Sequence, residues 1–448
     1  MKNNENNDQA GLFSVQLDFL CDKKQPLCQL AKKIEWEMFE REFGPLFCEN
    51  NGRPAKSIRL IVGLQYLKAT FGESDESVVE KWVQNPYWQY FCGETEFQHE
   101  FPIESTTMGK WRRRIQASGL EKLLAETIRC GLNAGVIKAQ ELKRVNVDTT
   151  VLEKSITFPT DAKLYHRMRE KLVVAAEKRG IKLRQTYVRK SKRSLLMQNR
   201  YRHCRQMKRA NRELRKLKTY FGRVMRDLGR KAGDYQNNDL QLVGLLDLAQ
   251  RLFRQKREDK NKIYSLHAPE VECIAKGKAH KKYEFGCKGS FVTSSKGNFV
   301  LGAMALHGSP YDGHTLEKAI NQTNQLLPGG HEVEHAHVDQ GYRGHGCGGL
   351  NVHITDRNQR RATASLRKWI KRRAAIEPII GHMKNDYGSD RNWFLGEDGD
   401  RIYALMLGYG FNFRKLLRAF CSSGRRRLAI FSEKIFGNFI FRLDWNPV

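Results

Sequence analysis

The sequence predicts an α/β protein in which a mixed sheet with flanking helices follows an all-α segment and is interrupted by a basic helical insertion. Three observations lead to this prediction. The first 140 residues place apolar side chains at helical spacing, and β-branched runs begin near residue 145 and return after residue 263. Between these runs lies a strongly basic stretch of helical pattern. A chain of 448 residues is long enough for two or three domains.

The charge of the chain points to a polyanionic partner. Lys and Arg number 79 against 49 Asp and Glu, which gives a net charge of +30. Nucleic acid is the leading partner class, and an anionic membrane surface is second. We expect no membrane partner, because no run of eighteen apolar residues occurs. The polar N-terminus and ten cysteines without a C-x-x-C pair favour a cytoplasmic, nucleoid-associated protein with reduced thiols.

Residues 1–140 are assigned to a helical N-terminal DNA-binding domain. An amphipathic helix begins after Ser57 and stops at Gly72, and a second helix begins near Ser74. A basic helix follows from Ser105. Its Lys110, Arg112 and Arg113 are candidate DNA contacts. This order suits a helix-turn-helix-like module, and it suits equally a plain helical bundle with a solvated basic face.

A basic insertion is expected over residues 162–265. Residues 163–231 contain 25 Lys and Arg but only four acidic residues. Apolar side chains from Leu214 to Leu228 trace one helical face, so we expect helices with one apolar and one cationic side. A short charge run is usually just solvated, whereas an excess this large self-repels without a polyanion.

The catalytic core is assigned to residues 141–420, with a basic and aromatic tail over 421–448. Its predicted elements follow the order strand, strand, strand, helix, strand, strand, helix, with the insertion after the first strand. This order is that of the ribonuclease H-like fold. Asp148 lies on the first strand and Asp339 ends the fourth. The two are expected on neighbouring strands, with Glu377 reaching in from a covering helix.

That covering helix is expected from Leu366 to Lys384. At about 100° per residue, Arg373, Glu377 and Lys384 fall within one narrow sector. Pro378 directly follows the glutamate and disfavours helical geometry there. The helix therefore either kinks at this point or restarts with Pro378 as its first residue.

Three converging carboxylates need a counter-charge, which a divalent cation supplies. Oxygen ligands favour Mg²⁺ or Mn²⁺, and two such ions promote in-line phosphoryl displacement. Arg373 and Lys384 would then bind DNA phosphate, and His382 and Arg343 are further candidate DNA contacts. A competing zinc site and a phosphate-binding glycine loop stay open as alternatives. The zinc ligands would be His335, His337, His345 and Cys347, and the glycines Gly341, Gly344, Gly346, Gly348 and Gly349.

Several motifs carry a resemblance to a known family. They are Asn85-Pro-Tyr-Trp-Gln-Tyr-Phe-Cys-Gly, Val147-Asp-Thr-Thr, Phe158-Pro-Thr-Asp, Pro310-Tyr-Asp-Gly-His-Thr-Leu, Val338-Asp-Gln-Gly-Tyr-Arg-Gly and the frame Arg373, Glu377, Lys384. Together they resemble bacterial insertion-sequence transposases of the DDE type, fifth insertion-sequence group. The resemblance implies that Asp148, Asp339 and Glu377 are the catalytic triad. Ile370 stands where the family signature has Tyr, so no role of that Tyr is transferred.

The resemblance implies a transposase that binds the terminal inverted repeats of its element and cleaves and joins double-stranded DNA with Mg²⁺ or Mn²⁺. A homodimer is expected in the synaptic complex, because two ends must be brought together. Two alternatives remain. One is a catalytically silent DNA-binding regulator derived from such an enzyme, and the other is a ribonuclease H-like nuclease without joining activity.

Overall fold

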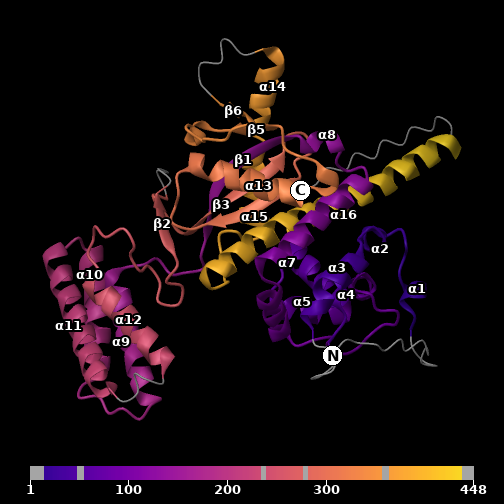
Figure 1. Ribbon diagram of the computed structural model, residues 1–448. Coiled ribbons are helices and arrows are strands. Elements are labelled where there is room, and N and C mark those ends of the chain that lie inside the picture. The colour runs from indigo at the N-terminus through magenta and orange to yellow at the C-terminus, as the bar shows by residue number, and fades with distance from the viewer. Residues whose placement is uncertain (1–14, 48–54, 234–238, 276–280, 356–362, 436–448) are drawn as a thin grey trace.

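A six-stranded mixed sheet lies at the centre of the protein in a computed structural model (Figure 1). The structure describes residues 15–47, 55–233, 239–275, 281–355 and 363–435. The strands run in the order β2-β3-β1-β5-β6, and β4 pairs with β3. They are β1 (Arg144–Glu153), β2 (Glu272–Ala275), β3 (Tyr283–Ser294), β4 (Val300–Leu306), β5 (His335–Val338) and β6 (Asn351–Ile354).

The central strand β1 is antiparallel to β3 and parallel to β5, and β5 is parallel to β6. The sheet is therefore mixed, which confirms the predicted α/β class. β3 and β4 form an antiparallel pair. β2 and β4 both pair with the edge of β3 that faces away from β1.

Side chains on β1 alternate between two differently covered faces of the sheet. Val145 and Val147 point to the face covered by α13, whereas Asn146 and Asp148 point to the face covered by α14, α15 and the first half of α16. The helices of this part are α8 (Ala139–Leu142), α13 (Leu316–Leu326), α14 (Ala364–Arg373), α15 (Ile376–Asp386) and α16 (Gly396–Ile435), with short 3₁₀ turns η3 (Asp312–Thr315), η4 (Pro328–Gly330) and η5 (Gln340–Tyr342).

The chain before the sheet is helical. As the sequence predicts, α4 is capped by the Ser57 hydroxyl and ends at Gly72, whose φ of 70° suits glycine. The helix α7 bends at Gln116. The elements are α1 (Leu17–Leu20), α2 (Pro26–Ala31), α3 (Trp36–Phe43), η1 (Gly44–Leu46), α4 (Ile58–Phe71), α5 (Asp75–Gln84), α6 (Pro86–Cys92) and α7 (Ser105–Asn133).

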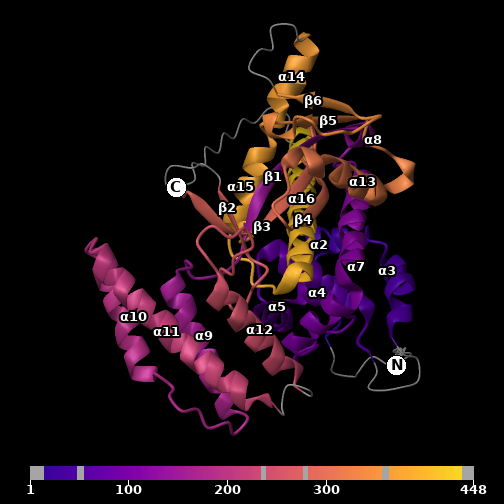
Figure 2. The same ribbon diagram turned by 60° about the vertical axis from the view of Figure 1, so that its left-hand side comes forward.

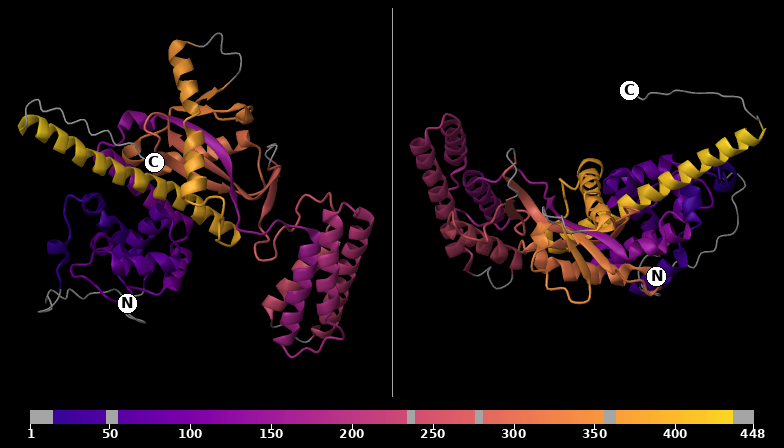
Figure 3. Two further views of the ribbon diagram at one scale, coloured as in Figure 1. Left: turned by 180° about the vertical axis from the view of Figure 1, so that it is seen from behind. Right: turned by 90° about the horizontal axis from the view of Figure 1, so that it is seen from above.

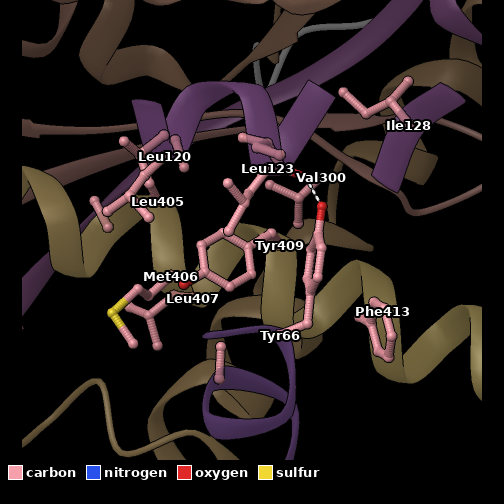
Figure 4. Close-up of a cluster of buried hydrophobic side chains, with 14 of the residues drawn as sticks. Tyr66, Leu120, Leu123, Ile128, Val300, Leu405, Met406, Leu407, Tyr409 and Phe413 are labelled. Carbon is pink, nitrogen blue, oxygen red and sulfur yellow. Dashed lines mark hydrogen bonds between the residues drawn. The ribbon is translucent and has the colours of Figure 1, made fainter. Parts of the chain in front are cut away.

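These N-terminal helices share one hydrophobic core with the sheet. Tyr66 of α4 packs against Tyr409 and Phe413 of α16, with ring centroids 5.5 and 4.9 Å apart. Its hydroxyl donates to the carbonyl of Leu123 in α7 at 2.8 Å (Figure 4). The predicted boundary at residue 140 therefore does not separate two cores. α16 also continues past residue 420 to Ile435, and residues 436–448 of the predicted tail lie outside the described residues.

The insertion forms a helical bundle that stands apart from the sheet in all views (Figures 1, 2 and 3). It has a hydrophobic core of its own, built around residues such as Leu172, Phe221 and Leu228. Its charged side chains are mostly exposed, including Arg189, Lys190, Lys192 and Arg193 on one helix. The helices are α9 (Asp161–Glu177), α10 (Val188–His203), α11 (Met207–Lys231) and α12 (Leu240–Arg254).

A buried ion-pair network holds the two connections between bundle and sheet. Lys154, just after β1, lies 2.6 Å from Asp400 at the start of α16 and 2.9 Å from Glu270, just before β2. Asp400 also accepts a hydrogen bond from Asn392 at 2.6 Å and contacts His307 at 3.0 Å. Lys154 thus links the segment that leads from β1 to the bundle, the segment that returns from the bundle to β2, and α16.

Two further findings concern helices and thiols. Within the described part of the chain, no helix combines the length and apolar character needed to cross a bilayer. Nine of the ten cysteines lie in the described ranges, and each is a free thiol.

Candidate active site

Asp148 and Asp339 stand level with each other on neighbouring strands. β1 and β5 pair in parallel with Asn146 opposite His337, and each aspartate lies two residues further along its strand. The extended backbone of Asp339 (φ −84°, ψ −177°) continues the alternation, so both carboxylates belong to one face. The backbone N–H of Thr149 donates to Asp148 Oδ1 at 2.8 Å, and that of Gly341 donates to Asp339 Oδ1 at 2.9 Å.

The covering helix predicted from residue 366 to 384 is two helices. α14 ends at Arg373 and α15 begins at Ile376. The break therefore precedes Pro378 instead of lying at it, and neither predicted option is found. Pro378 is the third residue of α15, where a helix has no intrahelical bond for a backbone N–H, so the proline fits without a kink.

The guanidinium of Arg373 lies between two of the predicted carboxylates. Its Nη2 is 3.0 Å from Glu377 Oε1, and its Nη1 is 3.6 Å from Asp148 Oδ2. The Glu377 side chain is 61% exposed, whereas that of Asp148 is 18% exposed. The structure thus brings Asp148 and Glu377 to the same place, around a cation supplied by the chain itself.

The other cations predicted near the triad have different surroundings. Lys384 points toward the sheet, with its Nζ 3.8 Å from Glu284 Oε1 on β3. His382 is exposed and lies 3.0 Å from Asp386 Oδ2. Arg343 is exposed in the loop after β5. Arg373 and Lys384 therefore do not line one helical stripe.

The structure corrects the prediction for Arg112. This residue is only 4% exposed, and its guanidinium pairs with both carboxylate oxygens of Asp75 at 2.9 and 2.5 Å. A buried bidentate pair of this kind fixes α7 against α5 and leaves no donor facing a duplex. Lys110 and Arg113 on the same helix are exposed.

Asp312, which has no predicted role from the sequence, lies beside the candidate triad. Its Oδ1 accepts hydrogen bonds from the Thr149 hydroxyl at 3.0 Å and from Lys288 Nζ at 2.9 Å. A Cβ on Gly341 would lie 3.0 Å from Asp339 Oδ1 and 3.2 Å from Asp312 Oδ2. The one signal in the sequence was its place in the motif Pro310-Tyr-Asp-Gly-His-Thr-Leu.

A buried hydroxyl lies among these aspartates. Tyr342 is fully buried, and its hydroxyl lies beside the Ser290 side chain of β3. Burial raises the pKa of Tyr342, and the negative charges of Asp148, Asp312 and Asp339 raise it further. The phenol is therefore protonated and able to donate a hydrogen bond.

The histidines considered for zinc are arranged differently from the proposed ligand set. His335 and His353 lie 3.1 Å apart through Nδ1 and Nε2, and His337 stacks between His353 and Trp369. His345 accepts a hydrogen bond from the backbone N–H of Cys347 at 3.1 Å. Gly344, Gly346 and Gly349 have positive φ, as expected of glycines that form a loop.

Among the described residues, the group of three possible metal ligands whose atoms lie within 4.8 Å of one another is Cys287, His307 and Asp400. Neither the zinc set nor the predicted triad forms such a group. Lys154 already neutralises Asp400 at 2.6 Å. We therefore interpret that trio as part of the ion-pair network.

Comparison with known protein families gives a match over the first part of the chain. Residues 15–114 match the family described as "Transposase domain (DUF772)", which covers α1 to the first part of α7. These residues are therefore similar to a transposase domain.

The chain also has a relative among known proteins. The chain is 49% identical over 195 residues to "Uncharacterized protein ORF8 in nfe locus" of Rhizobium meliloti, covering 44% of this chain and 94% of that protein. The chain belongs to the same family as that protein. No solved structure shows significant similarity to the chain described here.

Proposed function

We propose that this protein is a DDE-type DNA transposase whose catalytic residues are Asp148, Asp339 and Glu377. The observation that carries the proposal is Arg373, held between Asp148 and Glu377 at the level of Asp339. The matched transposase domain supports the class. The strand order, with β1 antiparallel to β3 and parallel to β5, is the order expected for a ribonuclease H-like core.

The donor atoms proposed for this site suit divalent cations, although the three carboxylates do not all lie within 4.8 Å of one another. Asp148, Asp339 and Glu377 offer oxygen ligands only, a donor set that suits Mg²⁺ or Mn²⁺. The protonated Tyr342 hydroxyl lies close enough to the three aspartates for their charges to raise its pKa. When bound, such ions activate the attacking oxygen and stabilise the leaving oxygen of an in-line phosphodiester displacement.

The chain itself orients these ligands and the substrate. The backbone N–H groups of Thr149 and Gly341 fix the rotamers of the two aspartates. On this proposal Arg373 would exchange its carboxylate partners for a DNA phosphate, as a planar fork, and Lys384 would have to leave Glu284 to act as a point charge. His382 of α15 and Arg343 of the loop after β5 are exposed and would add phosphate contacts.

Double-stranded DNA is the proposed partner, both as element ends and as target. The exposed cations of α10 and α11 and those of α7, Lys110 and Arg113, would contact phosphates over a long stretch of duplex. Arg112 is left out of this surface because it is buried. A homodimer would hold two ends together.

The test is incubation of the purified full-length protein with linear DNA carrying the element's own ends, with and without Mg²⁺. We expect Mg²⁺-dependent nicking and joined products. Asp339→Asn should abolish both while end binding persists, and the exposed Asp398→Asn should change neither. Unchanged transfer in Asp339→Asn would reject the proposal.

The same assay separates the alternatives. A silent regulator would bind ends without any Mg²⁺-dependent nicking by the wild type. A nuclease would nick but give no joined products.

A further inference from the structure

A carboxylate outside the candidate triad contacts the neighbours of two triad members. Asp312 precedes α13 and approaches the sheet from the face opposite Asp148, because Thr149 and Asp148 point to opposite faces of β1. Its side chain is 27% exposed and forms an ion pair with Lys288 of β3. The Lys288 side chain is 12% exposed. Lys288 also donates to the Pro310 carbonyl at 2.5 Å, so the loop carrying Asp312 is fixed to the sheet.

The contacts of Asp312 lead to both aspartates of the triad. Through Oδ1 it holds the hydroxyl of Thr149, whose backbone N–H orients Asp148. Through Oδ2 it lies against Gly341, whose backbone N–H orients Asp339. A Cβ at Gly341 would press on both carboxylates at 3.0 and 3.2 Å, so these oxygens would have to move by a few tenths of an ångström.

We infer that Asp312 is a positioning residue of this site, which braces Thr149 and the Gly341 turn so that Asp148 and Asp339 keep the separation that a divalent cation requires. The inference rests on the proposed function. Asp312 itself touches neither carboxylate through a hydrogen bond; it acts through Thr149 and Gly341.

The test measures Mn²⁺ binding by electron paramagnetic resonance and, separately, the steady-state kinetics of end cleavage. Asp312→Ala should weaken Mn²⁺ affinity and lower kcat by about 10- to 100-fold, the range typical of outer-shell groups. KM for end-containing DNA and the melting temperature should change little, which a merely structural role would not predict. Asp312→Asn, which keeps an acceptor for Thr149, should recover part of the affinity.

Two matched variants sharpen the result. Thr149→Val removes only the hydroxyl and should shift Mn²⁺ affinity in the same direction by less, whereas the exposed Asp398→Ala should have no effect. Gly341→Ala should reproduce the loss by pushing on both carboxylates.

The outcomes distinguish this inference from the proposed function. If Asp339→Asn abolishes Mn²⁺ binding and cleavage but Asp312→Ala leaves affinity within twofold of wild type, Asp312 has no positioning role. If Asp339→Asn leaves both unchanged, the proposed function fails and the inference fails with it.

Discussion

Arg373 occupies a place between Asp148 and Glu377 where the proposed function requires a metal ion. A guanidinium there competes with a divalent cation for the same oxygens. Arg373→Gln should therefore raise Mn²⁺ affinity on the order of tenfold, as expected for two competing ligands, while DNA cleavage falls because a phosphate contact is lost. Arg401→Gln, in an exposed ion pair, is the control. Weaker Mn²⁺ binding in Arg373→Gln would show that the arginine organises the carboxylates instead.

His337 makes stability depend on pH. Burial lowers its pKa from 6.5 to about 3, and the charges of His353, Arg144 and His335 act in the same direction. Above pH 6.5 the imidazole is neutral in both the folded and the unfolded chain. As pH falls below 6.5 the unfolded chain binds the proton and the folded chain does not, so stability is lost down to about pH 3.

When the pH is lowered from 7 to 5, His337 should reduce the free energy of unfolding by on the order of 2 kcal/mol. Urea unfolding of His337→Phe should show a smaller fall over that range than wild type. His382→Phe should keep the full fall, because His382 is exposed. Identical pH dependence in all three proteins would contradict the assignment.

The connections of the insertion to the sheet depend on Lys154. Lys154→Met leaves the buried Asp400 and Glu270 without their cation, and breaking such a pair costs about 3 kcal/mol or more. We expect a lower melting temperature and faster hydrogen exchange just after β1 and just before β2. Lys143→Met, in an exposed pair with Glu334, should stay within about 0.5 kcal/mol. Equal exchange in both variants would mean that packing, and not the ion pair, holds the junction.

The local sequence pattern predicted β1, β5 and β6, because the alternation of apolar and polar side chains along a strand depends only on neighbouring residues. It also placed Asp148 and Asp339 on neighbouring strands. Pattern did not predict the break after Arg373, where the Arg372 carbonyl accepts a hydrogen bond from Asn146 on β1 at 3.2 Å. The sequence pattern also did not indicate that Arg112 is buried and paired with Asp75.

Contacts between distant residues explain most of what the sequence missed. Asp312 and Thr149 lie 163 residues apart in the chain, and Lys154 and Asp400 lie 246 apart. Neither spacing carries a periodic signal. A single sequence therefore shows which residues can be ligands but not which residues brace them.

The bundle of α9 to α12 stands away from the sheet and has its own core, so on the proposed function it would offer DNA a second contact surface. Six or more phosphate contacts would lower the affinity for duplex DNA by about three orders of magnitude between 50 and 200 mM salt. Replacing four exposed α10 cations with Gln should reduce the slope of log K against log salt by up to about 3.6. The four are Arg189, Lys190, Lys192 and Arg193.

The control replaces four exposed lysines far from the bundle with Gln, namely Lys24, Lys32, Lys33 and Lys138. Fluorescence anisotropy with labelled duplex at five salt concentrations gives both slopes. Because the carboxylates lie on the sheet, kcat at saturating DNA should be the same in both variants. A slope in the α10 variant equal to that of wild type would mean that these charges do not meet phosphate. The excess of cations would then serve assembly between copies of the chain, which light scattering of the same variants would reveal.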